Sequence, residues 1–162
     1  MILRDTQELW KKASGGNPLS LYIWSINKEL YGVTMAGKAK ILLMDDEQII
    51  LDVTNEVLAF LGYDVMFAQD GAAAVDLYRR EKEAGVPFDI VILDLSVPEG
   101  MGGKEAIQKL REFDPAVKAI VSSGFGNDPA VTAFADYGFS AKLTKPYKIT
   151  DLKATLEDLL KK

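Results

Sequence analysis

Cysteine and histidine are both absent from this chain of 162 residues. Without cysteine there is no disulfide, no thiolate metal site and no cysteine nucleophile. Without histidine there is no Ser-His-Asp triad, no imidazole general base and no phosphohistidine on this chain. Any metal must therefore be held by oxygen ligands, which suits Mg²⁺, Mn²⁺ or Ca²⁺. Acid–base or acceptor chemistry falls to aspartate, glutamate, lysine, tyrosine, serine or threonine.

Long hydrophobic runs and a strong charge imbalance are absent as well. No stretch reaches the roughly 18 apolar residues of a membrane span, so we expect none. The first ten residues are charged and lack a signal-peptide core, which makes cytoplasm the expected location. A net charge of −5 argues against direct nucleic-acid binding. With 48% hydrophobic and 27% charged residues, the composition is that of a folded globular chain.

The chain divides near residue 37, where glycines interrupt the pattern. We expect an N-terminal helical extension and linker over 1–37 and one larger domain over 38–162. Both tryptophans, Trp10 and Trp24, lie in the extension. A segment this short cannot bury a core by itself. It must therefore pack on its own domain, on a second copy in a homodimer, or on another partner.

From residue 39 onward, short apolar runs alternate with segments of helical spacing. The expected strands are 39–44, 64–68, 88–93, 117–121 and 140–144, and the expected helices are 47–61, 71–83, 104–113, 128–137 and 149–160. This alternation predicts an α/β fold, a five-stranded parallel doubly wound sheet with helices on both faces. Ligands of such sheets bind at the carboxyl ends of the strands.

Chemically active side chains gather at those predicted strand ends. They are Asp45 and Asp46 after the first strand, Asp94 after the third, Ser122 and Ser123 at the fourth, and Lys145 after the fifth. Three clustered carboxylates repel one another, and a hard cation such as Mg²⁺ would compensate their charge. Asp94 can act as a nucleophile that forms an aspartyl-phosphate. Phosphoryl transfer mainly needs positioning and charge neutralisation, which Mg²⁺ and Lys145 would supply.

Four motifs, in this order, resemble the receiver domain of response regulators, the phosphoacceptor module of two-component signalling. They are Met44-Asp45-Asp46-Glu47, Ile92-Leu93-Asp94-Leu95, Val121-Ser122-Ser123-Gly124-Phe125 and Thr144-Lys145-Pro146-Tyr147. The resemblance covers Lys38 to Lys162 and implies a flavodoxin-like sheet of order 2-1-3-4-5, as in chemotaxis regulators. The glycine-rich loop 95–103 is one residue longer than usual and resembles receivers attached to hybrid sensor histidine kinases.

The resemblance also implies roles for individual residues around a magnesium ion. Asp94 would accept the phosphoryl group and also ligate Mg²⁺. Asp45 and Asp46 would be the acidic pair, one binding the metal directly and the other through water. The backbone carbonyl of Ser96 would complete the metal shell.

Further implied roles concern the phosphoryl group and the signal. Lys145 would bind the phosphate, with a cis peptide bond to Pro146. Ser123, 22 residues before Lys145, would be the switch hydroxyl, and Gly124 would leave room beside it. Lys142 stands where the family usually has its switch aromatic, so the common aromatic-rotation readout does not apply.

The expected function is therefore a signalling switch. A histidine kinase or phosphotransfer protein would donate the phosphoryl group in trans, and an unidentified output protein would read the switched surface. One alternative is an interaction scaffold that is never phosphorylated. The other is a Mg²⁺-dependent phosphohydrolase, which commonly needs a second acid two residues after its nucleophile, where this chain has Ser96.

Overall fold

The structure, a computed structural model, describes residues 37–162. The predicted extension lies outside the described residues except for Gly37. Its two helices, its docking, a homodimer through it and the domain boundary beside it therefore stay predictions.

Five strands form one parallel sheet, and its order is β2-β1-β3-β4-β5, which confirms the predicted topology. The strands are β1 (Lys40–Met44), β2 (Asp64–Ala68), β3 (Ile90–Asp94), β4 (Ala119–Ser123) and β5 (Ala141–Thr144). The third and fourth strands run one and two residues further than predicted. Asp94 and Ser123 are thus the last residues of their strands, held by the sheet itself.

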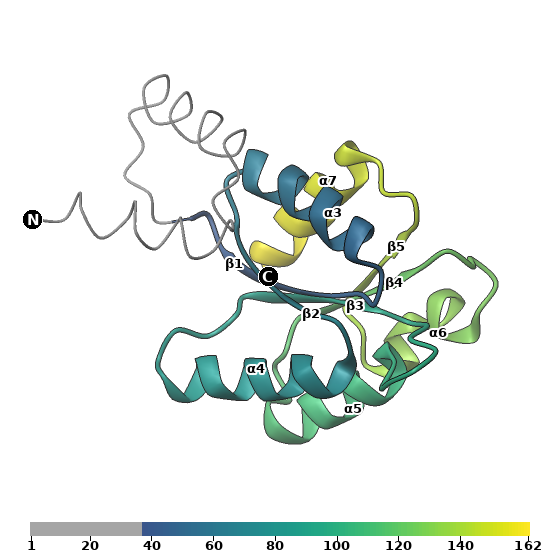
Figure 1. Ribbon diagram of the computed structural model, residues 1–162, viewed down its shortest axis with the longest axis horizontal. Helices are drawn as coiled ribbons and strands as arrows, with labels where there is room; N and C mark the ends of the chain where they lie inside the picture. The colour runs from purple at the N-terminus through teal and green to yellow at the C-terminus, as the bar shows by residue number, and fades with distance from the viewer. Residues whose placement is uncertain (1–36) are drawn as a thin grey trace, which may run out of the picture. The chain divides into compact units, whose positions relative to one another are not determined.

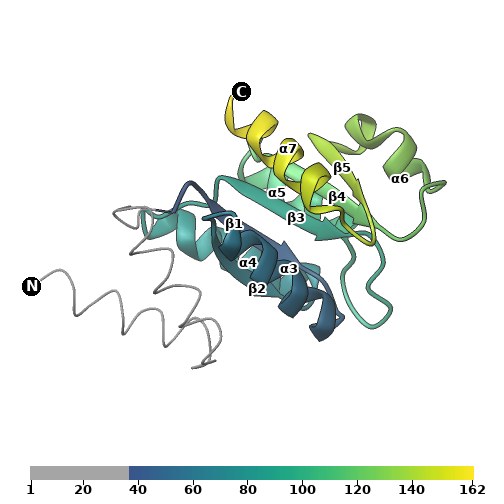
Figure 2. The ribbon, with the colours of Figure 1, turned by 90° about the horizontal axis from the view of Figure 1, so that it is seen from above.

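Helices cover both faces of the sheet, as Figures 1 and 2 show. The helices are α3 (Gln48–Phe60), α4 (Gly71–Glu83), α5 (Gly103–Phe113), α6 (Pro129–Thr132), the 3₁₀ turn η1 (Phe134–Tyr137) and α7 (Ile149–Leu160). In Figure 1, α3 and α7 lie above the sheet, while α4, α5 and α6 lie below it. This arrangement is the predicted double winding.

The buried side chains form one apolar layer on each face of the sheet. Alternate strand residues such as Leu43 and Ile92 pack with α3 and α7, while Val91 and Val121 pack with α4 and α5. Because both faces are covered, the central strands are apolar throughout, and all five residues of β3 are buried. The sheet is therefore a rigid support for the groups at its carboxyl edge.

The prediction of one continuous helix over 128–137 is wrong, because the segment is interrupted in its middle. Helix α6 ends at Thr132, and Ala133 has φ −118° and ψ 45°, outside the helical region. The Thr132 hydroxyl lies 3.4 Å from the carbonyl oxygens of both Asp128 and Pro129. Side-chain bonds of this kind compete with helix continuation. The chain resumes as the short 3₁₀ turn η1 instead.

A polar network joins α4 to the end of α5 below the sheet. The carboxylate of Asp114 accepts a hydrogen bond of 2.7 Å from the Tyr78 hydroxyl and pairs with the Lys82 ammonium. Burial raises the pKa of Asp114, but the hydrogen bonds from Lys82 and Tyr78 lower it more, so the net shift is downward. A carboxyl with a lowered folded pKa stabilises the fold above its unfolded pKa.

Asp114→Asn is therefore expected to destabilise the fold by about 1–3 kcal/mol at pH 7. The amide oxygen of the new asparagine can still accept the hydrogen bond from Tyr78, but the substitution removes the negative charge that faces Lys82. The difference from the parent chain should shrink as the pH falls below about 4 and Asp114 becomes protonated. Urea unfolding at pH 7 and pH 3 measures this. Asp158→Asn, which removes an exposed pair with Lys162 at 3.8 Å, is the control and should change little. An equal loss for Asp114→Asn at both pH values would contradict the prediction.

Candidate functional site

The predicted site residues meet at the carboxyl edge of the sheet. Asp45 follows β1, Asp94 ends β3, Ser123 ends β4 and Lys145 follows β5. These four strands follow one another in the sheet, in the order β1-β3-β4-β5, so their carboxyl ends lie along one edge. Lys145 and Asp45 are therefore in contact at 2.5 Å although 100 residues separate them in the sequence.

Three carboxylates form the acidic cluster of this edge. Asp45, Asp46 and Asp94 each have a carboxylate oxygen within 4.8 Å of the other two. Asp45 is fully buried and Asp94 is 5% exposed, whereas Asp46 is exposed to solvent. The structure thus brings together the three acids that the sequence singled out.

The hydrogen bonds distinguish the two adjacent acids. One oxygen of Asp45 accepts from the Glu47 backbone N–H at 3.0 Å, and the other accepts from the Lys145 ammonium. Both Asp45 oxygens are therefore already engaged. Among residues 37–162, no such hydrogen bond is present for Asp46, which is exposed beside the cluster.

Lys145 supplies the positive charge of the site. Its ammonium lies 2.5 Å from Asp45 Oδ2 and 3.3 Å from Asp94 Oδ1, and its side chain is 14% exposed. Burial alone lowers the pKa of Lys145, but Asp45 and Asp94 raise it more, so the net shift is upward. Lys145 therefore stays an ammonium at neutral pH. Its peptide bond to Pro146 is cis, as expected.

Asp94 lies in an environment that disfavours its charge. Burial raises its pKa, Lys145 lowers it, and Asp45 raises it again, with a net upward shift. A backbone hydrogen bond from Ser96 also favours the charged form. The carboxylate is thus poorly hydrated and held next to one cation, an environment that suits a nucleophile.

The glycine-rich loop after Asp94 allows α5 to start directly against the end of β3. A Cβ atom on Gly103 would lie 2.7 Å from the Asp94 carbonyl oxygen, and one on Gly102 would lie 2.6 Å from that of Leu95. No side chain fits at either distance. The two glycines therefore belong to the packing of this edge rather than to the acidic cluster.

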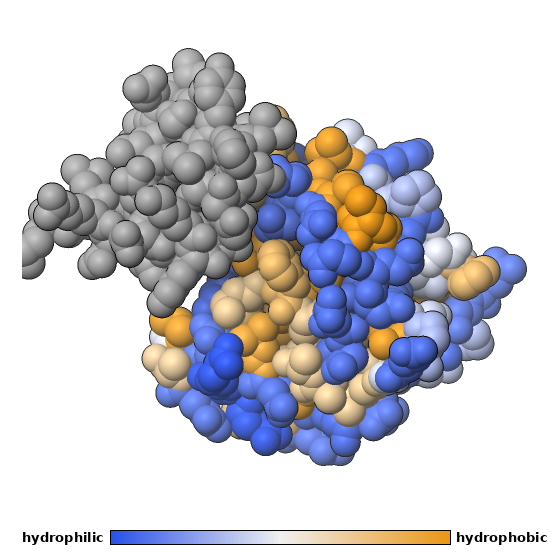
Figure 3. All heavy atoms as spheres, viewed as in Figure 1, coloured by the Kyte–Doolittle hydropathy of each residue, from blue (hydrophilic) through white to orange (hydrophobic). Residues whose placement is uncertain are grey.

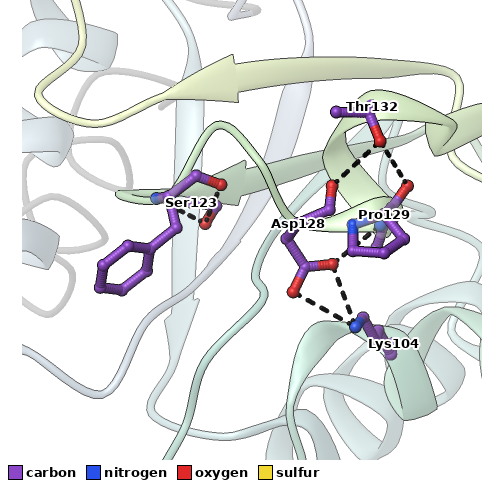
Figure 4. A network of polar contacts seen from close by, with 7 residues as sticks. Lys104, Ser123, Asp128, Pro129 and Thr132 are labelled. Atoms are coloured by element: carbon purple, nitrogen blue, oxygen red, sulfur yellow. Dashed lines mark hydrogen bonds and ion pairs between the residues drawn. The ribbon is translucent and has the colours of Figure 1, made fainter.

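Ser123 is turned toward its own loop, as Figure 4 shows. Its hydroxyl accepts a hydrogen bond of 3.0 Å from the Phe125 backbone N–H and donates one of 3.3 Å to the Phe125 carbonyl. A methyl group at Gly124 would meet no other atom within 4 Å, so the space beside Ser123 is open. The Phe125 side chain is 74% exposed.

An ion pair holds the far end of the same loop. The Lys104 ammonium, at the start of α5, lies 3.0 Å from Asp128 Oδ1, as drawn in Figure 4. Asp128 also caps α6 by accepting from the Ala130 N–H at 2.8 Å. That backbone bond is the main reason why the pKa of Asp128 is lowered, with Lys104 adding to it.

One polar contact at this edge was not predicted from the sequence, which placed Ser122 at the end of the fourth strand but gave it no partner. The Ser122 and Tyr147 hydroxyls share a hydrogen bond of 2.5 Å, and Ser122 is 1% exposed. Burial raises the pKa of Tyr147 to about 12, so its hydroxyl keeps its proton at neutral pH. The only hint of this contact in the sequence is that Ser122 and Tyr147 both carry hydroxyl groups and both lie within the motifs at the ends of the fourth and fifth strands.

Lys142 stands exposed on β5, with its ammonium 6.0 Å from the centre of the Phe134 ring. No aromatic ring occupies that position, as the sequence already indicated.

The donor set of this edge fits a hard divalent cation. It offers carboxylate oxygens only, within the distance that one small ion spans, and one of the acids is open to solvent. Mg²⁺ prefers such sites because it keeps several waters beside one or two carboxylates.

Within residues 37–162, none of the helices is long and apolar enough to cross a bilayer. The expected cytoplasmic location and the expected lack of nucleic-acid binding stay predictions.

A family model described as the response regulator receiver domain matches residues 41–157. Among curated proteins, the chain is 32% identical over 131 residues to the sensor kinase CckA of Brucella abortus (strain 2308). That match covers 79% of this chain and 13% of the kinase. The chain is 27% identical over 121 residues to sporulation initiation phosphotransferase F of Bacillus subtilis (strain 168), covering 75% of this chain and 93% of that protein.

A solved structure shows the same architecture with a metal ion. It is the receiver domain of the sensor histidine kinase PA1611 from Pseudomonas aeruginosa PAO1, with magnesium coordinated in its active site cleft. The TM-score is 0.69 at 25% identity, over 78% of this chain and 100% of that one. The chain spans about half the length of several curated proteins named as probable transcriptional regulators that it also matches.

Proposed function

Because this chain belongs to the family of response regulator receiver domains, we propose that Asp94 accepts a phosphoryl group from a histidine kinase or phosphotransfer protein. The observation that carries the proposal is the position of the Lys145 ammonium between two buried carboxylates, those of Asp45 and Asp94. Receiver domains are phosphoacceptor modules of two-component signalling.

In the transfer step, a carboxylate oxygen of Asp94 forms a bond to the phosphorus. The bond from phosphorus to the imidazole nitrogen of the donor breaks, and that nitrogen keeps the electron pair. The sequence contains no histidine, so the phosphohistidine lies outside it. Hydrolysis of the aspartyl-phosphate by water would later return Asp94 to its carboxylate.

Lys145 neutralises charge during this step. Its ammonium lies 3.3 Å from Asp94 Oδ1, so it can contact an oxygen of a phosphoryl group on Asp94. The contact with Asp45 keeps the ammonium in place before the phosphoryl group arrives. Fixed charges that need no rearrangement are the main way in which proteins accelerate phosphoryl transfer.

Asp45, Asp46, Asp94 and the Ser96 carbonyl would hold Mg²⁺ in this site. Asp46 is the better direct ligand, because both oxygens of Asp45 already accept hydrogen bonds and Asp46 is exposed. Asp45 would then act through water. Bound there, Mg²⁺ supplies positive charge that offsets the charge of the phosphoryl oxygens.

Phosphoryl uptake is expected to require Mg²⁺ and to depend on Asp46. Removing Mg²⁺ with EDTA should abolish the adduct formed with acetyl phosphate, as read by intact mass. Asp46→Asn should raise the Mg²⁺ concentration for half-maximal uptake by roughly tenfold or more. Even the loss of a residue that contacts a metal ligand typically lowers metal affinity by about tenfold or more.

Asp76→Asn removes an exposed carboxylate on α4, outside the acidic cluster, and is the matched control. It should leave the Mg²⁺ dependence unchanged. Uptake at full rate in EDTA would contradict the proposed metal site. An unchanged Mg²⁺ requirement in Asp46→Asn would contradict the direct role of Asp46.

Ser123 would transmit the change to the surface. To bond a phosphoryl oxygen, its hydroxyl must give up the two bonds to Phe125, which alters the loop between β4 and α6. The Lys104–Asp128 ion pair resists that change at the other end of the loop. The loop thus becomes a two-state element that phosphorylation biases toward an output protein.

A further inference from the structure

The Ser122–Tyr147 contact has no role in the function described so far. We propose that Ser122 and Tyr147 are positioning residues, whose shared hydrogen bond holds Lys145 against the carboxylates of Asp45 and Asp94. The inference rests on the proposed function and identifies what sets the position of the phosphate-binding lysine.

Ser122 lies beside the phosphoacceptor in the sheet. Ile92 pairs in register with Ile120, and both belong to the core layer under α3 and α7. Asp94 pairs in register with Ser122, two residues further along each strand. Because side chains alternate along a strand, Asp94 and Ser122 face that same side. The Ser122 hydroxyl is thus fixed next to the acidic cluster by the central strands.

Two contacts tie the chain that leaves β5 to the end of β4. The Lys145 backbone N–H donates to the Ser123 carbonyl at 2.9 Å. Two residues later, the Tyr147 hydroxyl meets the Ser122 hydroxyl at 2.5 Å. The first contact fixes the backbone of Lys145, and the second fixes the direction in which the chain continues. Together they determine where the Lys145 side chain begins.

Tyr147 packs against the core layer under α3 and α7, and its hydroxyl adds a contact with a defined direction. The residue is partly buried and borders a small groove of about 120 Å³ between α3 and the start of α7, which Val53 and Ile149 also line. Both of these side chains are more than half exposed, and Figure 3 shows apolar atoms at the surface over these helices. The ring therefore has open space on one side. The hydroxyl contact with Ser122 is its directional restraint.

Small errors in position matter here because Lys145 acts over a few ångströms. Its ammonium must stay within reach of both Asp45 Oδ2 and Asp94 Oδ1, at 2.5 and 3.3 Å. A displacement of about 1 Å can slow a reaction by up to about a hundredfold. Loss of the Ser122–Tyr147 bond should therefore slow phosphoryl uptake without removing any group that touches the phosphoryl.

The test compares Tyr147→Phe and Ser122→Ala with the double variant. Tyr147→Phe leaves the Ser122 hydroxyl buried without its partner, so both stability and uptake from acetyl phosphate should fall. The double variant removes both polar groups and should regain much of the stability. If the pair positions Lys145, uptake in the double variant remains roughly tenfold slower than in the unaltered chain. If uptake recovers along with the thermal midpoint, the contact is only structural and the inference is overturned.

A second measurement asks whether the pair acts through Lys145. In a Lys145→Met background, Tyr147→Phe should cause no further loss of uptake, because the group that it positions is gone. Equal losses in both backgrounds would overturn the inference. Tyr78→Phe is the matched control, since it also breaks a tyrosine hydrogen bond, with Asp114, away from the site. It should lower the thermal midpoint and leave the uptake rate unchanged.

The unaltered chain separates this inference from the proposed function. If that chain forms no phosphoryl adduct with either a small donor or a kinase, the proposed function fails and the inference fails with it. If the unaltered chain forms the adduct and the double variant does so equally fast, the inference alone fails.

Discussion

Asp94→Asn is expected to abolish phosphoryl uptake, with a loss of at least about a thousandfold in rate. The amide has nearly the same size and shape as the carboxylate, but its nitrogen and oxygen are poor nucleophiles toward phosphorus. Intact mass after incubation with acetyl phosphate and Mg²⁺ gives the fraction that carries the adduct. Asp76→Asn is the control, because Asp76 lies on α4, away from the acidic cluster. It should take up the phosphoryl group like the unaltered chain.

The same substitution should not unfold the protein. Burial raises the pKa of Asp94 above its usual value, so its charge costs folding free energy at neutral pH. Removing that charge is expected to leave stability unchanged or to raise it. Urea unfolding without Mg²⁺ measures this. A large loss of stability in Asp94→Asn would contradict the proposed electrostatics of the site, and uptake at the normal rate would exclude Asp94 as the acceptor.

Lys145→Met is expected to lower both stability and uptake. Asp45 and Asp94 would then share a buried region without a counter-charge, because the contacts at 2.5 and 3.3 Å are lost. Removing one partner of a buried ion pair costs about 3 kcal/mol or more. Uptake should fall roughly a hundredfold, as when a charge-stabilising donor is removed from other active sites.

Magnesium separates the two effects of Lys145→Met. Because a cation in the acidic cluster also balances the carboxylates, millimolar Mg²⁺ should restore part of the lost stability but not the uptake rate. Lys153→Met, at an exposed pair with Glu157, is the control and should change stability by less than about 0.5 kcal/mol. Unchanged stability in Lys145→Met would show that the lysine does not balance the buried carboxylates.

The sheet and most of the acidic cluster could be predicted from the sequence because their signals are local. Each strand is a short apolar run, and the run of β3 ends directly at Asp94. Parallel strands all end at one edge, so placing the strands also placed Asp45, Asp94 and Lys145 together. The regular alternation of strands and helices was enough to give the double winding.

Other features depend on contacts that no local pattern records. Ser122 and Tyr147 are 25 residues apart, and they meet only because of the register of β4 and the path that follows β5. Asp45 and Asp46 differ through hydrogen bonds from Glu47 and Lys145, which fix one acid and leave the other open. At the break after α6 the Thr132 hydroxyl bonds to backbone carbonyls, a contact that helical spacing does not reveal, and the spacing alone predicted an unbroken helix.

The most direct test identifies the residue that carries the phosphoryl group. After reaction with acetyl phosphate and Mg²⁺, borohydride reduces an aspartyl-phosphate to homoserine, which tandem mass spectrometry of the peptides can locate. A phosphoacceptor at Asp94 predicts homoserine at position 94 and at no other aspartate. Homoserine at 45 or 46, or a phosphoryl adduct that resists borohydride, would contradict it.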